Sequence, residues 1–289
     1  MKKTILYIIL ICFAAPYSFG QKKLLKETPG AVSYTFRDAL AKDVPGTLDK
    51  IKAMGITNME FSSYRSSMFF GQTPQHLREL LDARGMRCTS IGVDFENLQN
   101  NLDEVIAAAK ALNAEFVRIG SIPHPGNFQN LTADVVKQAA IDFNTFGKKL
   151  HEAGLTFCYH NHGPEFKPGT ELGEPMLFDY LVKNTDPKYV SYEMDVLWVY
   201  WPGADPVAFL KKYPDRFKLM HVKNVKKGIP LGGPSTNVSV GEGQIDMEAV
   251  LKTAQKTAIK YYYIEDESPA QFIDAQVPAS IKYMGGLTR

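Results

Sequence analysis

The feature that most constrains the fold is a regular alternation of short β-like runs with longer helix-like runs. Eight such pairs follow one another from residue 31 to the end of the chain, with no Pro/Gly-rich linker and no low-complexity segment. Strands that alternate with helices form a parallel sheet. Eight pairs within about 260 residues predict a single-domain α/β fold, the closed (β/α)8 or TIM barrel. An open, doubly wound sheet is the alternative.

Local signals mark the ends of several predicted helices. Gly55, Gly85 and Gly154 each follow a helix-like run, where a left-handed residue closes a helix before the next strand. Pro74 and Asp205 stand at the starts of two others, where Pro fits the first turn and Asp caps it. These positions support the alternation independently of hydrophobicity.

The first twenty residues have the layout of a secretory signal peptide. Lys2 and Lys3 precede an apolar run over residues 5–15, and the small residues Ser18 and Gly20 follow. A membrane anchor is the alternative, but the run is shorter than the roughly 20 residues that a spanning helix needs. We therefore expect residues 1–20 to be removed during export, which implies a periplasmic location.

Removal of this segment leaves an N-terminal extension of residues 21–30 and a barrel over residues 31–289. The full chain has 33 basic and 31 acidic residues, and the segment holds two lysines and no acids, so 31 residues of each sign remain. A chain of balanced charge has no general attraction for nucleic acid or an anionic membrane. We expect neither as a partner, while a homo-oligomer stays open.

Polar residues gather at the predicted carboxyl ends of the fifth and sixth strands. Side chains alternate along a strand, so Tyr159 faces the helices while His160 and His162 face the barrel interior. On the sixth strand Glu193 and Asp195 share the inward face, with Asp195 last. The active sites of TIM barrels lie at this end of the strands.

The next two strands repeat the pattern. Phe217, Leu219, His221 and Lys223 are predicted to share the inward face of the seventh strand, and Glu265 ends the eighth. Four successive strands thus deliver His, Asp, His and Glu to one rim. Lys223 follows His221 closely and would reach a substrate carbonyl or hydroxyl, or pair with a glutamate.

This convergence predicts a catalytic metal site with the ligands His160, Asp195, His221 and Glu265. Imidazole nitrogens and carboxylate oxygens suit Mn²⁺, Co²⁺, Zn²⁺ or Fe²⁺. We take Mn²⁺ as the first choice and keep the other three and Mg²⁺ as alternatives. Any one of these residues alone would be explained as hydrogen-bonded filler or a helix cap, so the prediction depends on their joint position.

A second set of residues is predicted to contact a polyhydroxylated substrate. Each member also has a structural explanation: a buried Glu–Arg pair, a histidine that shapes a turn, or Trp packing in the core. The set comprises Glu60, Arg118, His124, His162, Trp198 and Trp201. The irregular stretch at residues 227–244 is expected to form a flexible flap over the barrel mouth.

Five motifs resemble one family in order and spacing: "YHNHGPEF", "YEMDVLWVYWPGADP", "FKLMHVKNV", "GEGQID" and "YYYIEDE". The family is the xylose-isomerase-like TIM barrels, described as sugar phosphate isomerases/epimerases, whose superfamily includes AP endonuclease family 2. The resemblance covers nearly all of the chain after residue 30 and implies a divalent metal held by Glu, Asp, His and Glu. Asp195, His221 and Glu265 match three of these positions. His160 stands where the family has the first glutamate, and Glu165 is the alternative ligand.

The resemblance and the residues together predict a metal-dependent isomerase or epimerase that removes a proton beside the carbonyl of a keto-sugar. Glu265, His160 and Lys223 are the predicted catalytic residues. The alternative is a lyase that cleaves 3-keto-glycosides by β-elimination, since only one evident carboxylate base remains. An apurinic endonuclease-like enzyme and a non-catalytic sugar-binding protein are less favoured hypotheses. A periplasmic enzyme without a P-loop favours an unphosphorylated sugar.

Overall fold

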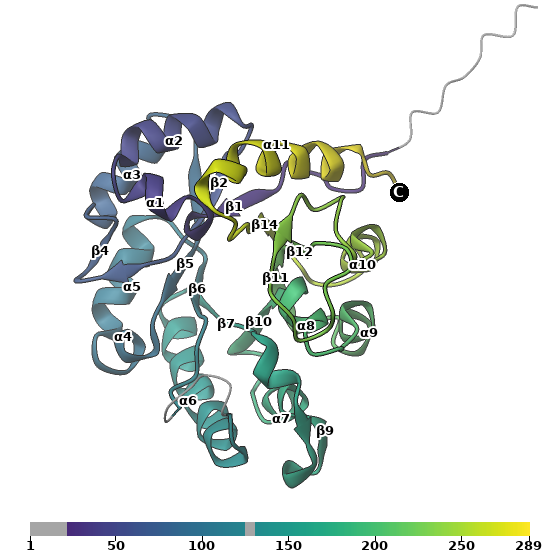
Figure 1. Cartoon of the computed structure of the whole chain (residues 1–289). Helices are drawn as coiled ribbons and strands as arrows, with labels where there is room; N and C mark the ends of the chain where they lie inside the picture. Colours follow the sequence, from purple (N-terminus) through teal and green to yellow (C-terminus); the bar gives the residue numbers. More distant parts are fainter. Residues whose placement is uncertain (1–21, 125–130) are drawn as a thin grey trace, which may run out of the picture.

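Eight parallel strands close into a barrel in the computed structural model, which describes residues 22–124 and 131–289 (Figure 1). Because β1 pairs with both β2 and β14, the sheet has no free edge. This closure confirms the (β/α)8 barrel and excludes the open doubly wound sheet. The barrel strands are β1 (Gly30–Val32), β2 (Asn58–Phe61), β5 (Arg87–Val93), β6 (Phe116–Ile119), β7 (Thr156–His160), β10 (Val190–Asp195), β11 (Phe217–Val222) and β14 (Tyr261–Ile264).

One main helix follows each barrel strand and covers the outside of the sheet (Figure 1). These helices are α2 (Val44–Ala53), α3 (Pro74–Asp82), α5 (Leu102–Ala111), α6 (Ala133–Glu152), α7 (Leu177–Lys183), α9 (Pro206–Lys212), α10 (Met247–Ala254) and α11 (Ala270–Gly286). Short helices lie in the connections: η1 (Ser33–Phe36), α1 (Arg37–Leu40), α4 (Phe95–Asn100), η2 (Gly163–Phe166), η3 (Thr170–Leu172) and α8 (Val196–Tyr200). Three two-stranded hairpins complete the loops: β3 (Tyr64–Arg65) with β4 (Met68–Phe69), β8 (Pro168–Gly169) with β9 (Glu174–Met176), and β12 (Asn224–Val225) with β13 (Asn237–Val238).

The helix boundaries follow the predicted signals. Gly55, Gly85 and Gly154 have φ angles of +91°, +61° and +81°, the left-handed conformation that a helix end requires and that glycine adopts without strain. Pro74 is the first residue of α3, and Asp205 caps α9 by accepting a hydrogen bond from the Val207 amide.

The alternation of side chains separates the barrel interior from the helix-facing layer. Phe157 and Tyr159 of β7 pack on Phe143 of α6, with ring centroids 5.3 and 4.8 Å away. The interior holds a separate buried cluster of Phe116, Cys158, Leu219 and Tyr263. Tyr159 therefore faces the helices, as predicted, which leaves His160 on the inner face.

Phe217 is an exception to the predicted alternation. Its ring stacks on Phe178 of α7 at 5.7 Å with an interplanar angle of 2°, so it faces the helices rather than the interior. The pairing of β10 with β11 shifts register between Tyr192 and Glu193, so Tyr192 lies opposite Phe217 and Glu193 opposite Leu219. A register shift of this kind breaks the simple parity rule at the start of a strand.

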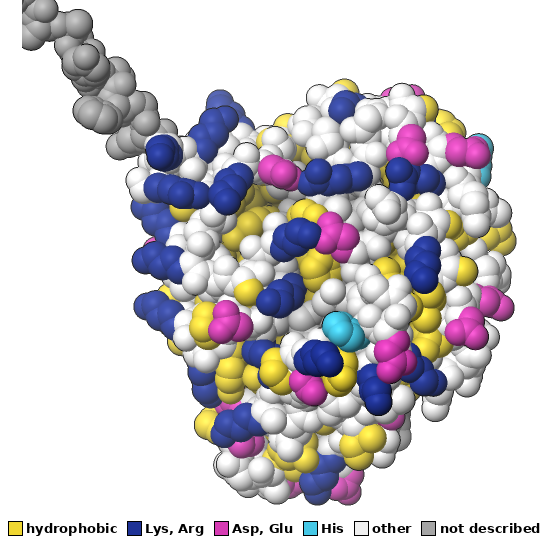
Figure 2. Space-filling model, turned by 180° about the vertical axis from the view of Figure 1, so that it is seen from behind, with side chains coloured by type: hydrophobic (Ala, Val, Ile, Leu, Met, Phe, Trp, Pro, Cys, Tyr) yellow, Lys and Arg dark blue, Asp and Glu magenta, His cyan; other side chains and the backbone are white. Residues whose placement is uncertain are grey.

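The two ends of the described chain lie side by side (Figure 1). Lys23 forms an antiparallel bridge with Thr288, and the Leu24 amide donates to the Leu287 carbonyl at 2.8 Å. The predicted signal peptide lies outside the described residues. Within residues 22–124 and 131–289, no helix is both long and apolar enough to cross a membrane. Figure 2 shows basic and acidic side chains interspersed over one face, with Lys and Arg gathered along the edge beside the N-terminal segment.

Truncating Phe178 to alanine tests the helix-facing layer. Phe178 is fully buried and its ring contacts the rings of Phe166, Tyr192 and Phe217. We expect Phe178→Ala to lower the free energy of unfolding by about 3–5 kcal/mol, because it opens a cavity. The control is Phe272→Ala, a residue that is 48% exposed, which should change stability by less than about 0.5 kcal/mol. Urea denaturation of both variants measures the difference, and equal losses would contradict the assignment.

Candidate active site

The carboxyl ends of four neighbouring barrel strands meet in a buried cluster of histidine and acid side chains. His160 ends β7, Asp195 ends β10, His221 lies in β11 and Glu265 directly follows β14. Strand pairing sets Asp195 beside His221 and His160 beside Glu193, which adds a fifth member. All five side chains are buried. The structure therefore brings the four predicted metal ligands into one cluster and adds Glu193.

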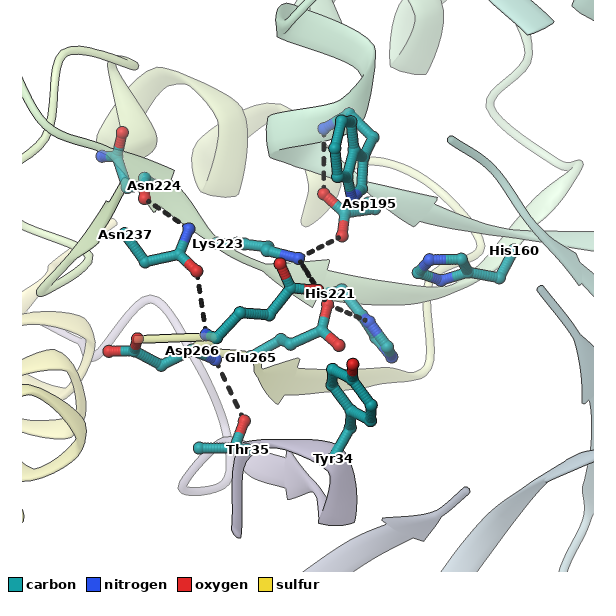
Figure 3. Close-up of polar contacts among 12 residues, drawn as sticks. Tyr34, Thr35, His160, Asp195, His221, Lys223, Asn224, Asn237, Glu265 and Asp266 are labelled. Carbon is teal, nitrogen blue, oxygen red and sulfur yellow. Dashed lines mark hydrogen bonds and ion pairs between the residues drawn. The ribbon is translucent and has the colours of Figure 1, made fainter. Parts of the chain in front are cut away.

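Asp195, His221 and Glu265 form the outer group of this cluster. One ligand atom from each lies within 4.8 Å of the other two. The Nδ1 atom of His221 is 3.1 Å from Oε2 of Glu265. The ammonium of Lys223 lies beside the same acids, 3.1 Å from Glu265 and 3.6 Å from Asp195, and 2.8 Å from Glu267 (Figure 3).

His160, Glu193 and His221 form the inner group, whose ligand atoms also lie within 4.8 Å of one another. The Oε2 atom of Glu193 is 3.0 Å from Nδ1 of His160 and 3.2 Å from Nε2 of His221. His160 thus joins a different set of ligand atoms from Asp195 and Glu265, and His221 belongs to both sets.

Glu60 and Arg118 form the buried ion pair that was one of their predicted explanations. Nε of Arg118 lies 2.6 Å from Oε1 of Glu60 and 3.3 Å from Oε2 of Glu193. Glu60 is also 2.9 Å from Nε2 of His221 and accepts a hydrogen bond from Ser90 at 2.7 Å. With the partners Arg118, His221 and Ser90 around it, the Glu60 carboxylate is a central support of the cluster.

The acids on both sides of His221 fix its charge. Burial by itself lowers the pKa of His221, but Glu193, Glu265 and Glu60 outweigh burial and raise that pKa well above its ordinary value. Each ring nitrogen faces a carboxylate oxygen, so both carry a proton and the side chain is an imidazolium. His221 therefore supplies a positive charge at the centre of the cluster.

Lys223 and Glu265 stabilise each other's charges. Burial alone would lower the pKa of Lys223, but Glu265, Asp195 and Glu267 raise it above its ordinary value. Burial alone would raise the pKa of Glu265, but Lys223 and His221 hold it well below its usual range. Lys223 is therefore an ammonium whose side chain is fully buried.

The remaining acids and histidines of the cluster are shifted towards their neutral forms. Burial, with smaller contributions from nearby like charges, raises the pKa values of Glu193 and Asp195 to about 7. Burial and the neighbouring cations lower the pKa of His160 well below its ordinary value and that of His162 to about 4. At neutral pH both histidines are uncharged, so each has one nitrogen that can accept a proton or bind a metal.

His162 and the two tryptophans line the wall of the site. The ring of Trp198 lies 5.6 Å from the ring of His162, and the Lys223 ammonium lies 5.6 Å from the centre of the Trp198 ring. Trp201 stands behind Trp198 at 5.7 Å, and its indole nitrogen donates to the Gly233 carbonyl at 2.7 Å. Trp198 therefore contacts the charged groups directly, while Trp201 holds the loop at residues 227–236.

Glu165 and His124 are two predicted candidates that lie outside both groups of ligand atoms. Glu165 is buried, and its Oε1 accepts hydrogen bonds from the Tyr159 hydroxyl and, at 3.1 Å, from the His162 amide. It belongs to neither group of metal-ligand atoms among the described residues, which leaves His160 as the candidate from this segment. His124 lies in the loop after β6, and its Nε2 is buried without a hydrogen-bond partner within the described part of the chain.

Sequence reasoning missed three residues near the cluster. Glu193 was placed on the inward face of its strand but was given no role at the site. Glu267 pairs with Lys223, and its amide donates to Asn237 at 2.8 Å. Tyr34, in η1, directs its hydroxyl towards Glu265 and His221 and is 40% exposed (Figure 3). Only Glu193 had a usable signal, namely its position two residues before Asp195.

The donor set fits a divalent cation. Oδ2 of Asp195 and Oε1 of Glu193 are buried without a hydrogen-bond partner among the described residues. Buried carboxylate oxygens are costly unless a hydrogen-bond donor or a cation satisfies them. Imidazole and carboxylate donors together suit Mn²⁺, Fe²⁺, Co²⁺ and Zn²⁺. The outer group of Asp195, His221 and Glu265 would hold such an ion.

Comparisons with known proteins agree with the fold. Residues 48–284 match the family model described as xylose isomerase-like TIM barrel. A curated relative, inosose dehydratase from Lacticaseibacillus casei, is 22% identical over 76% of this chain and 72% of its own length. A solved sugar phosphate isomerase/epimerase from Parabacteroides distasonis is 25% identical with a TM-score of 0.71, over 94% of this chain and 96% of that chain. A solved structure described as IOLI protein with a binding zinc atom is 12% identical with a TM-score of 0.67, over 89% of this chain and 95% of that chain. The dehydratase and the isomerase/epimerase are enzymes, as this chain was predicted to be.

Replacing His221 tests whether the outer group binds a metal ion. We expect His221→Gln to lose stoichiometric binding of Mn²⁺ or Zn²⁺, measured by elemental analysis after loading and dialysis, while circular dichroism reports a retained fold. The wild-type affinity should rise with pH up to the elevated pKa of His221, because the ion must displace a proton from this imidazolium. The exposed His76, whose partner is Glu79, provides the control His76→Ala. Full metal content in His221→Gln would contradict the site.

Glu165 should make stability depend on pH. Burial raises the pKa of Glu165 from 4.5 to about 7, so the folded state holds its proton more tightly than the unfolded state does. Its favourable contribution is complete below pH 4.5 and is lost as pH rises through 7. The unfolding free energy of the wild type minus that of Glu165→Gln should therefore fall by roughly 3 kcal/mol between pH 5 and pH 8. A difference independent of pH would show that Glu165 ionises normally.

Proposed function

The chain belongs to the xylose isomerase-like TIM barrel family, and on this premise we propose that it is a metal-dependent lyase acting on a keto-sugar or keto-cyclitol. The proposed reaction removes a proton beside the ketone and expels the group on the next carbon. The observation that carries the proposal is that the site holds both a base and an acid. His160 and His162, beside β7, are neutral histidines, and Lys223, beside β11, is a buried ammonium. The dehydratase name of a relative supports elimination.

A divalent ion held by Asp195, His221 and Glu265 would polarise the ketone oxygen and make the neighbouring C–H bond more acidic. The zinc atom described for a structural neighbour supports this cofactor. Glu265 and Asp195 are then engaged as ligands and as partners of Lys223, which leaves the proton transfers to other groups.

A neutral histidine accepts the proton in this proposal. His160 and His162 are uncharged at neutral pH, and their ring centroids lie 4.8 Å apart. When one of them takes the proton, the electron pair of the C–H bond is delocalised into the ketone. In a second step this pair forms the carbon–carbon double bond of the product, and the bond from the next carbon to its oxygen substituent breaks.

Lys223 protonates the departing oxygen. Its ammonium lies 3.1 Å from Glu265, 2.8 Å from Glu267 and 5.6 Å from the centre of the Trp198 ring. The two acids keep it protonated until the departing oxygen, which becomes a stronger base than an amine as its bond to carbon breaks, takes the proton. The products are an unsaturated ketone and water or an alcohol. The substrate proton ends on a histidine, and the Lys223 proton ends on the departing oxygen. The burial of Lys223 keeps bulk water away from this step.

Isomerisation or epimerisation on the same site is the second candidate function. The sugar phosphate isomerase/epimerase that aligns over 94% of this chain supports it. These reactions share the first proton removal and differ in where the proton returns. A second base on the opposite face of the substrate would be required, and Glu193 is the available carboxylate.

We propose an unphosphorylated small-molecule substrate and an exported, periplasmic enzyme, on the basis of the signal-peptide layout of residues 1–20. Nucleic acid is a weak candidate partner, because the chain has nearly equal numbers of basic and acidic residues, 33 and 31. A non-catalytic sugar-binding role has less support than catalysis, because the buried ammonium and histidines are costly groups that simple binding does not need.

Proton NMR in D₂O tests the proposal directly. Metal-loaded protein is incubated with a 3-keto-glucoside and with an inosose, and the spectra are followed over time. We expect a new vinylic signal together with release of the aglycone or of water. Deuterium entering the substrate without a leaving group would identify an isomerase or epimerase instead. Saturable binding with neither change would leave a sugar-binding protein.

Replacing Lys223 separates elimination from proton exchange. Lys223→Met should reduce product formation by about 100-fold or more, because the departing oxygen loses its proton donor. Deuterium uptake beside the ketone should decrease less, since that step uses a histidine. Lys211→Met, at an exposed lysine of α9, is the control and should retain full activity. An unchanged elimination rate in Lys223→Met would rule out this role.

A further inference from the structure

Glu193 is a fully buried acid without an assigned role, and its contacts are concentrated on one oxygen. Oε2 lies 3.0 Å from Nδ1 of His160, 3.2 Å from Nε2 of His221 and 3.3 Å from Nε of Arg118. Oε1 is buried and has no hydrogen-bond partner among the described residues. One carboxylate oxygen therefore meets three nitrogen atoms while the other meets none.

Two of these three contacts are shared with a better-placed acid. Arg118 lies closer to Glu60, at 2.6 Å, than to Glu193, and Nε2 of His221 is likewise closer to Glu60, at 2.9 Å. Glu60 is therefore the closer partner of both cations, although Glu193 also helps to stabilise the charge of His221. His160 is different, because its contact with Glu193 is the shortest that Glu193 makes.

We infer that Glu193 is a positioning residue that holds His160 with its proton on Nδ1 and its lone pair on Nε2. The catalytic consequence of this inference rests on the proposed function, whereas the position of the proton follows from the contacts alone. Oε2 of Glu193 also faces Nε of Arg118, a group that can only donate, so this oxygen is an acceptor and the close contact with Nδ1 of His160 requires the hydrogen on Nδ1. The neutral ring then carries its lone pair on the other nitrogen.

The fixed lone pair suits either role of His160. A ligand needs an unprotonated nitrogen that faces the ion, and a base needs one that faces the substrate proton. The His160 ring points from β7 towards Asp195 and Lys223 (Figure 3), and its centroid is 4.6 Å from that of His221. In the opposite tautomer an N–H bond on Nε2 would block both roles.

The chain keeps the ring in place from several sides. Strand pairing sets Glu193 directly opposite His160, so the acid and the histidine are joined through their backbones as well as their side chains. On another side, the ring of His221 lies with its centroid 4.6 Å from that of His160 and the ring of His162 with its centroid 4.8 Å away. The histidine is 4% exposed and has little room to rotate.

The test measures the tautomer of His160 by ¹⁵N NMR of histidine-labelled, metal-free protein at pH 7.5, with His160→Gln used to assign the signal. The wild type should show a protonated Nδ1 and an unprotonated Nε2. Glu193→Gln should keep this tautomer, because its amide oxygen can still accept the hydrogen bond. Glu193→Met, similar in size but without an acceptor, should move the population towards the Nε2–H form. Glu60→Gln removes a charge from the same cluster without a contact to His160, and it should leave the His160 tautomer unchanged.

The inference is overturned if wild-type His160 is protonated on Nε2, or if Glu193→Met keeps the Nδ1–H form. The wild-type and Glu193→Gln spectra still decide the point if Glu193→Met does not fold. Steady-state kinetics adds a second readout, since Glu193→Met should lower kcat by about 10- to 100-fold with little change in KM. A correct tautomer in a protein that turns over no keto-sugar would refute the proposed function and leave the positioning role intact.

Discussion

The position of His221 between two groups of carboxylates is the constraint on which the site depends. Its Nδ1 atom faces Glu265, and its Nε2 atom faces Glu60 and Glu193. A neutral imidazole can donate from only one nitrogen, so this double contact requires the imidazolium unless another cation replaces a proton. The closed barrel keeps the acids at these distances because each strand is paired on both sides. The protonation of His221 and the binding of a metal ion are therefore linked, because an ion that binds His221 must displace a proton from it.

The sequence was sufficient for the barrel and for the convergence of its strand ends. Asp195, His221 and Glu265 each stand at the carboxyl end of a strand, and a parallel barrel places such ends together whatever the loops do. The alternation rule was wrong at Phe217, because a register shift between β10 and β11 has no local sequence signal. Glu193 was undervalued for a similar reason. Its partners come from other strands, so only the assembled barrel reveals what it contacts.

The loops could be predicted least well, because their contacts join segments far apart in the chain. Trp201 was predicted to contact a sugar, and the structure shows in addition that it connects two loops. Its indole nitrogen donates to Gly233, and its own carbonyl accepts from Gly232 at 2.8 Å. On its other side, a side chain at Gly163 would meet the Trp201 ring at 2.8 Å, so the close approach requires glycine. The stretch expected to be a flexible flap is thus fastened at its centre to the wall of the site.

The antiparallel bridge between Lys23 and Thr288 holds the two ends of the described chain on the same side of the molecule. The neighbouring cavity of about 640 Å³ is lined by residues 25–30, Arg289 and the strand-start residues Asn58, Arg87 and Tyr261, so both ends lie at the amino-terminal end of the barrel. The charged cluster lies at the other end. Anything joined directly before Lys22 or after Arg289, whether a tag, a solid support or another protein, would therefore be attached at the end of the barrel opposite the charged cluster. Joining the two ends directly would also change little in the barrel, which makes the chain a good candidate for circular permutation.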